Sequence, residues 1–91
     1  MLNKLIISAY GPDRKGIVSE ISAIISNNNG NIETSKMIRL EDQFSILMLI
    51  EINSNKTKEL KNELQKIKKL EIDVKITNYN NKNDKNKFYL Y

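Results

Sequence analysis

The stretch Gly11-Pro12-Asp13-Arg14-Lys15-Gly16-Ile17-Val18 joins an apolar run rich in β-forming residues to an apolar run with helical periodicity. Glycine followed by proline favours a turn, because glycine reaches backbone conformations that other residues avoid and proline fixes φ at about −65°. Asp13 is predicted to cap the following helix, since its short carboxylate accepts hydrogen bonds from the free N–H groups of a first turn. The stretch therefore predicts a tight strand-to-helix connection.

The same connection has the features of a site for a small ligand. A helix start carries unpaired N–H donors and a partial positive charge, and both suit a carboxylate. Gly16, in the predicted first turn, leaves room for a ligand, and Asp13 is placed to receive an ammonium group. Together these features suit a free amino acid. A turn in which the glycines and the aspartate serve only the chain geometry explains the same eight residues without a ligand.

The remaining hydrophobic patterns predict four strands and two helices. Strands are expected at residues 2–10, 32–40, 44–50 and 71–77, and helices at 16–28 and about 56–69. This order predicts an α+β fold, the ferredoxin-like βαββαβ sandwich, with a four-stranded antiparallel sheet and two helices on one face. The strand at 44–50 is apolar at nearly every position, which is typical of a strand covered on both faces. A partner subunit is one candidate for the second cover.

Local signals also predict the ends of the elements and the limits of the domain. Gly30 is expected to end the first helix in the left-handed conformation, and Asn53-Ser54-Asn55 to open the second. One domain is predicted over residues 1–78, followed by an Asn/Lys-rich flexible linker at 79–87. The aromatic segment 88–91 (Phe-Tyr-Leu-Tyr) is predicted to be an extra edge strand or the start of a second domain, and the pattern does not choose between them.

Composition excludes several classes of function. The 91 residues contain no cysteine and no histidine, which removes disulfides, thiolate nucleophiles, the usual zinc sites and the commonest general base. The net charge of +4 comes mostly from lysine in a chain crowded with asparagine and isoleucine, so it is weak support for nucleic-acid binding. No apolar run is long enough for a signal peptide or a membrane span. We expect a cytoplasmic protein with no cofactor, no metal and no catalytic activity.

With the loop Gly-Pro-Asp-Arg-Lys-Gly-Ile-Val at 11–18 and Asn-Gly-Asn-Ile at 29–32, the chain resembles an ACT domain over residues 2–77. Within that family it is most similar to the stand-alone and tandem bacterial group that includes the glycine cleavage system transcriptional repressor. ACT domains are small regulatory modules that typically sense amino acids, associate through their sheet edges or faces, and bind effectors at the interface. The resemblance implies the ligand-binding positions Gly11, Pro12, Asp13, Arg14, Gly16, Ile17, Asn31 and Ile32.

The resemblance also implies a role for most of these positions. Asp13 matches the position that takes the ligand's amine, and the backbone N–H groups of Gly16 and Ile17 match those that hold its carboxylate. Asn31, followed by Ile32, opens the second strand and matches the position that reaches the ligand at the interface. Gly11 and Pro12 shape the loop, and Arg14 faces either a carboxylate or solvent. Many family members have proline where this chain has Lys15, so the loop is expected to be less rigid here.

The resulting prediction is a non-catalytic regulatory domain. It would sense a small amino acid, glycine or serine first, at a homodimer interface, in a regulator of the glycine-cleavage type that acts on a protein partner. The alternative is a ligand-free protein-interaction module, suggested by the two-sided apolar strand and the aromatic segment. An RNA-recognition module is disfavoured because the third strand has no aromatic platform for stacking bases. No direct contact with nucleic acid or membrane is expected.

Overall fold

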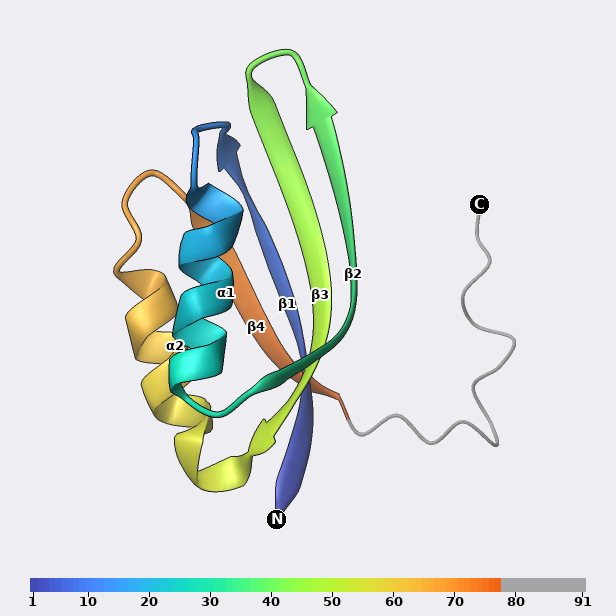
Figure 1. Ribbon diagram of the computed structural model, residues 1–91, viewed down its shortest axis with the longest axis vertical. Helices are drawn as coiled ribbons and strands as arrows, with labels where there is room; N and C mark the ends of the chain where they lie inside the picture. The colour runs from blue at the N-terminus through green and yellow to red at the C-terminus, as the bar shows by residue number, and fades with distance from the viewer. Residues whose placement is uncertain (78–91) are drawn as a thin grey trace, which may run out of the picture.

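The computed structural model describes residues 1–77 and has the predicted order of elements (Figure 1). The elements are β1 (Leu2–Pro12), α1 (Ile17–Asn27), β2 (Asn31–Leu40), β3 (Gln43–Asn53), the 3₁₀ helix η1 (Ser54–Lys56), α2 (Thr57–Gln65) and β4 (Glu71–Thr77). The strands form one antiparallel sheet in the order β2-β3-β1-β4, and both helices cover the same face. The predicted ferredoxin-like βαββαβ sandwich is thus confirmed. The linker predicted at 79–87 and the aromatic segment at 88–91 lie outside the described residues.

The core lies between the sheet and the two helices. Along β1, Leu5, Ile7 and Ala9 point toward the helices and are buried, while Ile6 and Tyr10 point to the other face. This alternation follows from the two-residue period of a strand. The remaining buried apolar side chains come from α1, β3, α2 and the turn after α2: Ile17, Ile21, Ile25, Phe44, Ile46, Met48, Ile50, Ile52, Leu60, Leu64 and Ile67.

Strand β3 is apolar on both faces, and the described part of the chain covers only one of them. Its helix-facing residues are buried, whereas Leu47 on the opposite face is 51% exposed. The expectation of cover on both faces is therefore not met by residues 1–77. Apolar composition identified an interior strand of the sheet correctly, but it does not say what packs against the second face.

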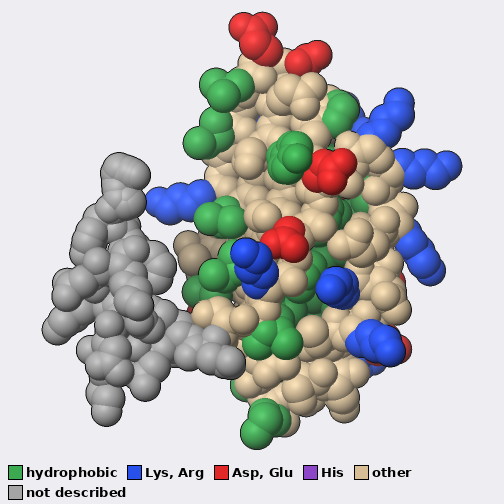
Figure 2. Space-filling model, turned by 180° about the vertical axis from the view of Figure 1, so that it is seen from behind, with side chains coloured by type: hydrophobic (Ala, Val, Ile, Leu, Met, Phe, Trp, Pro, Cys, Tyr) green, Lys and Arg blue, Asp and Glu red, His purple; other side chains and the backbone are tan. Residues whose placement is uncertain are grey.

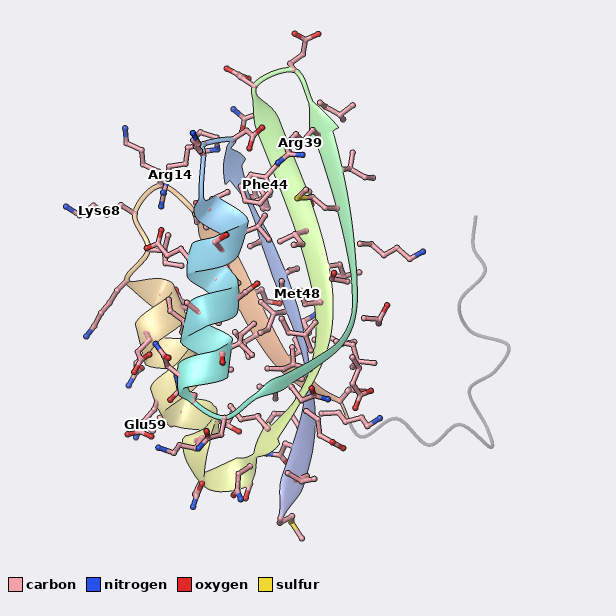
Figure 3. The ribbon with its side chains drawn as sticks, viewed as in Figure 1. Arg14, Arg39, Phe44, Met48, Glu59 and Lys68 are labelled. Carbon is pink, nitrogen blue, oxygen red and sulfur yellow. The ribbon has the colours of Figure 1, made fainter. Side chains whose placement is uncertain are left out.

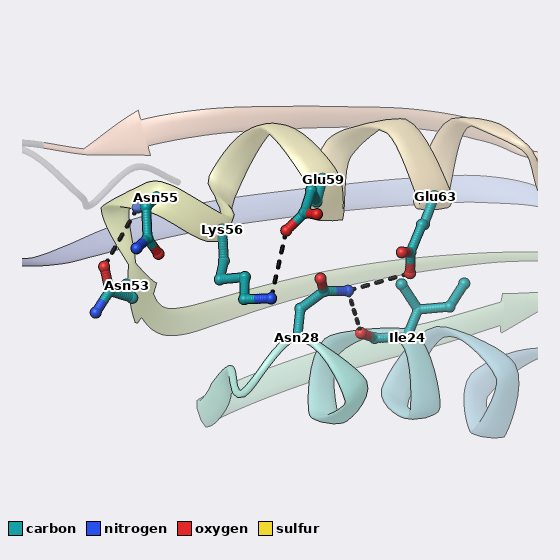
Figure 4. Close-up of polar contacts among 7 residues, drawn as sticks. All are labelled: Ile24, Asn28, Asn53, Asn55, Lys56, Glu59 and Glu63. Carbon is teal, nitrogen blue, oxygen red and sulfur yellow. Dashed lines mark hydrogen bonds and ion pairs between the residues drawn. The ribbon is translucent and has the colours of Figure 1, made fainter.

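The helix ends differ from the predictions in detail. The residue with positive φ after α1 is Asn29 (φ 63°), not Gly30. Gly30 is needed for a different reason, since a Cβ there would lie 2.8 Å from Cγ2 of Ile25. The second helix is shorter than predicted, beginning as η1 and ending at Gln65. Asn53 does cap this segment, as its side chain accepts a hydrogen bond from the backbone N of Asn55 at 3.3 Å (Figure 4).

A buried asparagine joins the two helices. The Asn28 side chain donates to the carbonyl oxygen of Ile24 at 2.9 Å and to Oε1 of Glu63 at 3.1 Å (Figure 4). Asn28 is 4% exposed, so these two bonds satisfy an amide that would otherwise be costly to bury. They fix the end of α1 against α2, at the end of the helical layer opposite to the β1–α1 loop.

Candidate functional site

The β1–α1 loop is built differently from its predicted form. Helix α1 begins at Ile17, and its N-cap is Gly16, which has φ 83° and offers no side-chain cap. The prediction that Asp13 caps this helix is therefore wrong, and Gly16 lies just before the first turn rather than in it. A positive φ costs other L-residues about 1–2 kcal/mol, which explains the glycine.

Asp13 instead contacts the β2–β3 hairpin. Its Oδ2 accepts a hydrogen bond from Nε of Arg39 at 2.7 Å, and its backbone N donates to the carbonyl oxygen of Asp42 at 2.9 Å. The Asp13 side chain is 28% exposed and that of Arg39 is 55% exposed. Figure 3 shows Arg39 and Phe44 on the two strands of this hairpin, at the same end of the sheet as the loop. The two contacts tie the loop to the hairpin.

Arg39 is the residue of this region that sequence reasoning missed. It lies 26 positions from Asp13 in the sequence and is not part of any motif. Only the fold brings it over the loop, because β2 runs back toward the end of the sheet where β1 ends. An exposed ion pair contributes about 0.2–1 kcal/mol, so another cation can replace Arg39 at small cost.

The start of α1 offers backbone donors beside open space. The first intrahelical bond runs from the N of Glu20 to the carbonyl oxygen of Gly16 at 2.9 Å, so the N–H groups of Gly16–Ser19 precede the regular ladder. A Cβ added to Gly16 would have no atom within 4 Å. The Ile17 side chain is buried in the core, and its N–H donates to the carbonyl oxygen of Arg14 at 3.3 Å. The Ile17 side chain is therefore unavailable to a ligand, and a carboxylate would reach the Ile17 N–H only by replacing the Arg14 carbonyl oxygen.

Arg14 is engaged within its own loop and helix. Its Nη2 lies 2.7 Å from Oε1 of Glu20, with both side chains nearly half exposed. Glu20 also places a negative charge in the first turn of α1, where the helix dipole favours it. The Arg14 side chain therefore contacts a carboxylate of its own chain and is also nearly half exposed to solvent.

Gly11 and Pro12 form the end of β1. Pro12 is exposed and pairs with Gln43, and Gly11 is buried against the turn that precedes β4. A Cβ on Gly11 would lie 2.6 Å from the carbonyl oxygen of Lys69 and 2.9 Å from Cδ2 of Leu70. Gly11 thus has a packing role, which sequence alone could not separate from a ligand-binding one.

We expect Gly11→Ala to destabilise the domain by about 1–3 kcal/mol, because the backbone at Lys69 cannot move aside as a flexible side chain could. In a domain of this size the melting temperature should fall by roughly 4–20 °C. Lys15→Ala, in the exposed part of the same loop, is the matched control and should change stability by less than about 0.5 kcal/mol. Thermal unfolding followed by circular dichroism measures both, and equal melting temperatures would refute the packing role.

Asn31 and Ile32 lie at the opposite end of the sheet from the loop. Asn31 pairs with Glu51, whereas Pro12, at the start of the loop, pairs with Gln43 on the same strand β3. Gln43 and Glu51 are eight positions apart on β3, a distance on the order of 26 Å. The chain therefore brings Asp13, Arg14 and Gly16 together in one loop, and it does not bring Asn31 or Ile32 to them.

Hollows of the described surface lie elsewhere, and they include a polar one of about 270 Å³ between β1 and β4, lined by Ser8, Tyr10, Glu71, Ile72 and Asp73. Two apolar hollows lie on the face of the sheet opposite the helices. One of about 310 Å³ is lined by Tyr10, Ile38, Leu40, Gln43, Phe44 and Ser45. A second of about 170 Å³ is lined by Ile6, Thr34, Ser35, Lys36, Leu47, Met48 and Leu49. Within residues 1–77 no cluster of acidic side chains could hold a metal ion, and neither helix is long and apolar enough to cross a membrane.

The comparisons with known proteins agree with one another on the family to which this chain is similar. A family model described as the ACT domain matches residues 3–77. The UPF0237 protein MJ1558 of Methanocaldococcus jannaschii is 34% identical over 67 residues, covering 71% of this chain and 74% of that protein. The glycine cleavage system transcriptional repressor of Escherichia coli is 41% identical over 46 residues, covering 50% of this chain and 24% of the repressor.

A solved structure of a putative glycine cleavage system transcriptional repressor has the same fold. It superposes with a TM-score of 0.79 at 26% identity and covers 88% of this chain. This chain spans 48% of the length of that solved chain. The likeness thus extends over nearly all of the present chain but over only about half of its structural relative.

Proposed function

The chain belongs to the ACT domain family, and we propose on that basis that it is a non-catalytic regulatory domain that binds a small amino acid between two copies of itself. Glycine and serine are the first candidates. Asp13 receives the ligand's ammonium group, and the backbone N–H groups around Gly16 and Ile17 receive its carboxylate. The domain acts in the cytoplasm as part of a regulator of the glycine-cleavage type, through a protein partner rather than through DNA.

The observation that carries this proposal is the combination of charges at the β1–α1 loop. The Asp13 carboxylate already holds a cationic group at 2.7 Å, the guanidinium of Arg39, on the exposed side of the loop. Beside it, Gly16 opens a space next to the first N–H groups of α1. A zwitterion needs both an anion and a set of hydrogen-bond donors at short range, and this loop supplies both. The ligand's ammonium group replaces Arg39 on Asp13.

The proposed dimer accounts for the distance of Asn31 from the loop. Strand β2 is at the edge of the sheet and all ten of its residues are exposed. If two β2 strands pair antiparallel across a two-fold axis, the Asn31 end of each strand lies beside the Leu40 end of the other. Arg39, next to Leu40, contacts Asp13. Edge pairing therefore carries the partner's Asn31 toward the loop, which a single chain cannot do.

A thermal-shift panel of amino acids, run on the wild type and on Asp13→Asn, tests the proposal. A ligand at 100 times its dissociation constant adds about 2.7 kcal/mol, which should raise the melting temperature by roughly 10–20 °C in a domain this small. Asp13→Asn should weaken binding by about 10- to 100-fold, the loss of one charged hydrogen bond. At the same ligand concentration the shift should then fall to less than about half.

Asp73→Asn is the matched control, since Asp73 is an exposed carboxylate on β4, across the sheet from the loop's hairpin. It should keep the full thermal shift. A shift that both variants retain would show that the ammonium group binds elsewhere. A flat panel for the wild type would favour the second candidate, a protein-interaction module without ligand, which the exposed apolar side chains on the sheet support.

A further inference from the structure

The face of the sheet opposite the helices carries a band of exposed apolar side chains. We call it the open-face band, formed by Ile6, Tyr10, Ile38, Leu40 and Leu47. Leu47 is 51% exposed, Ile38 61% and Leu40 70%. Figure 2 shows hydrophobic side chains on this face of the sheet, with charged side chains among them. The neighbouring positions on this face include Ser8, Ser45 and Lys36. Several exposed large apolar side chains on one face of a small domain mark a place of interaction.

The band is narrow because the β4 side of the same face is charged. Glu71 pairs with Tyr10, and Lys75 pairs with Ile6, so each lies directly beside a member of the band. Asp73 lies between them and is 4.0 Å from Nζ of Lys75. A whole second sheet laid on this face would have to bury these charges, which costs free energy unless each finds a partner. A single short segment can cover the band and leave β4 in water.

The chain contains such a segment at a suitable distance. We propose that Phe88-Tyr89-Leu90-Tyr91 docks on the open-face band of its own chain, in the hollow between Ile6 and Leu47. Strand β4 ends at Thr77, which pairs with Lys4, two positions along β1 from Ile6. The path from Thr77 across one strand and along β1 to Ile6 is on the order of 8 Å. The ten residues 78–87 span up to about 33–36 Å when extended, so the aromatic segment reaches the hollow without strain.

Because the linker holds the aromatic segment close to the domain, a weak docking contact is enough to keep it bound. A short linker holds its end at an effective concentration in the millimolar range, so a docking contact with a dissociation constant near 1 mM is already substantially occupied. Three aromatic residues and a leucine offer a large apolar surface for that purpose. The hollow, of about 170 Å³, is lined mainly by apolar atoms, and its lining residues include Ile6, Leu47 and Leu49 together with Thr34, Ser35 and Lys36. The occupant and the surface therefore match in chemistry.

The absence of cysteine makes a clean test available. Because the chain has no cysteine, Tyr89→Cys supplies a single attachment point for a nitroxide spin label. The nitroxide broadens the NMR signals of backbone amides close to it. We expect the amides of Ile6, Leu47 and Leu49 to lose more intensity than the amides of α1, which lie one layer farther from the label on the other side of the sheet. Adding Leu47→Asp, an exposed position whose change spares the core, should restore the lost intensities.

Three results from the spin-labelled chain alone would overturn the proposal. They are unchanged intensities on the open face, broadening confined to the helical face near Ile76, and broadening that persists with Leu47→Asp. A mixture of isotope-labelled chains without nitroxide and unlabelled chains with nitroxide tells whether the docked segment comes from the same chain or from a second copy. Broadening in that mixture would mean that a second copy supplies the segment, which contradicts docking within one chain. The readout needs no amino-acid ligand, so it is independent of the proposed function.

Discussion

Ile7→Ala should destabilise the domain by about 2–5 kcal/mol, because it removes three carbon atoms from a side chain with no exposure and leaves a cavity. Ile7 lies in the middle of β1, which pairs with β3 on one side and β4 on the other. The packed layer between sheet and helices can collapse only partly around the gap. Native domains are stable by only about 5–15 kcal/mol, so this single change should remove a large share of the total.

Ile6→Ala is the matched control, since the same residue type, one position earlier on the same strand, points to the opposite face. Ile6 is 37% exposed, so its truncation should cost less than about 1 kcal/mol. Urea unfolding followed by far-UV circular dichroism gives both values. If Ile7→Ala does not fold, Ile7→Val should still lose about 0.5–1.5 kcal/mol. Equal losses at the two positions would contradict the assignment of the faces of β1.

The alternation that separates Ile6 from Ile7 is also what made the fold predictable. Strand positions with a two-residue period and helix positions with a three-to-four-residue period fix which side chains face a common core. The order of elements then leaves few topologies for a chain of this length. What the pattern did not predict was the open second face of β3, because Leu47 has the same composition signal whether a partner, a tail or water covers it.

The ends of the helices were predicted less well, for a local reason. Asp13 and Gly30 are both residue types that commonly cap helices, and each lies within a few positions of a true helix end. The caps are instead Gly16 and Asn28, with the left-handed conformation at Asn29. Several neighbouring residues in each loop can adopt the required conformation, and tertiary contacts decide among them. For Asp13 the deciding contact is Arg39.

The candidate site was predictable only in its local part. Asp13, Arg14 and Gly16 are close in sequence, and any fold with this loop keeps them together. Arg39 enters through the curvature and register of the β2–β3 hairpin, which a single sequence does not encode in a readable motif. Asn31 was grouped with the loop through family resemblance, although in one chain it lies at the other end of the sheet.

Because Asp13 and Asn31 lie far apart within one chain, a mixture of two variants can test whether two chains share one site. In the proposed dimer each site takes Asp13 from one chain and Asn31 from the other. Asp13→Asn and Asn31→Ala should therefore each lower the affinity for the amino acid in their own homodimers, Asp13→Asn by about 10- to 100-fold. When the two variants are mixed and subunits exchange, each heterodimer contains one intact site, made of the native Asp13 of one chain and the native Asn31 of the other.

Random exchange makes about half of the dimers heterodimers, and each of these has one intact site of two. The mixture should therefore recover about a quarter of the wild-type binding capacity at wild-type affinity, since affinity at each site depends only on its own contacts. Isothermal titration calorimetry measures both capacity and affinity. A mixture of wild-type chains with and without an affinity tag is the control for exchange, because native mass spectrometry then counts the heterodimers that form. No recovery in the first mixture, with exchange demonstrated in the second, would mean that Asp13 and Asn31 do not meet across the interface, and a site within one loop would replace the shared one.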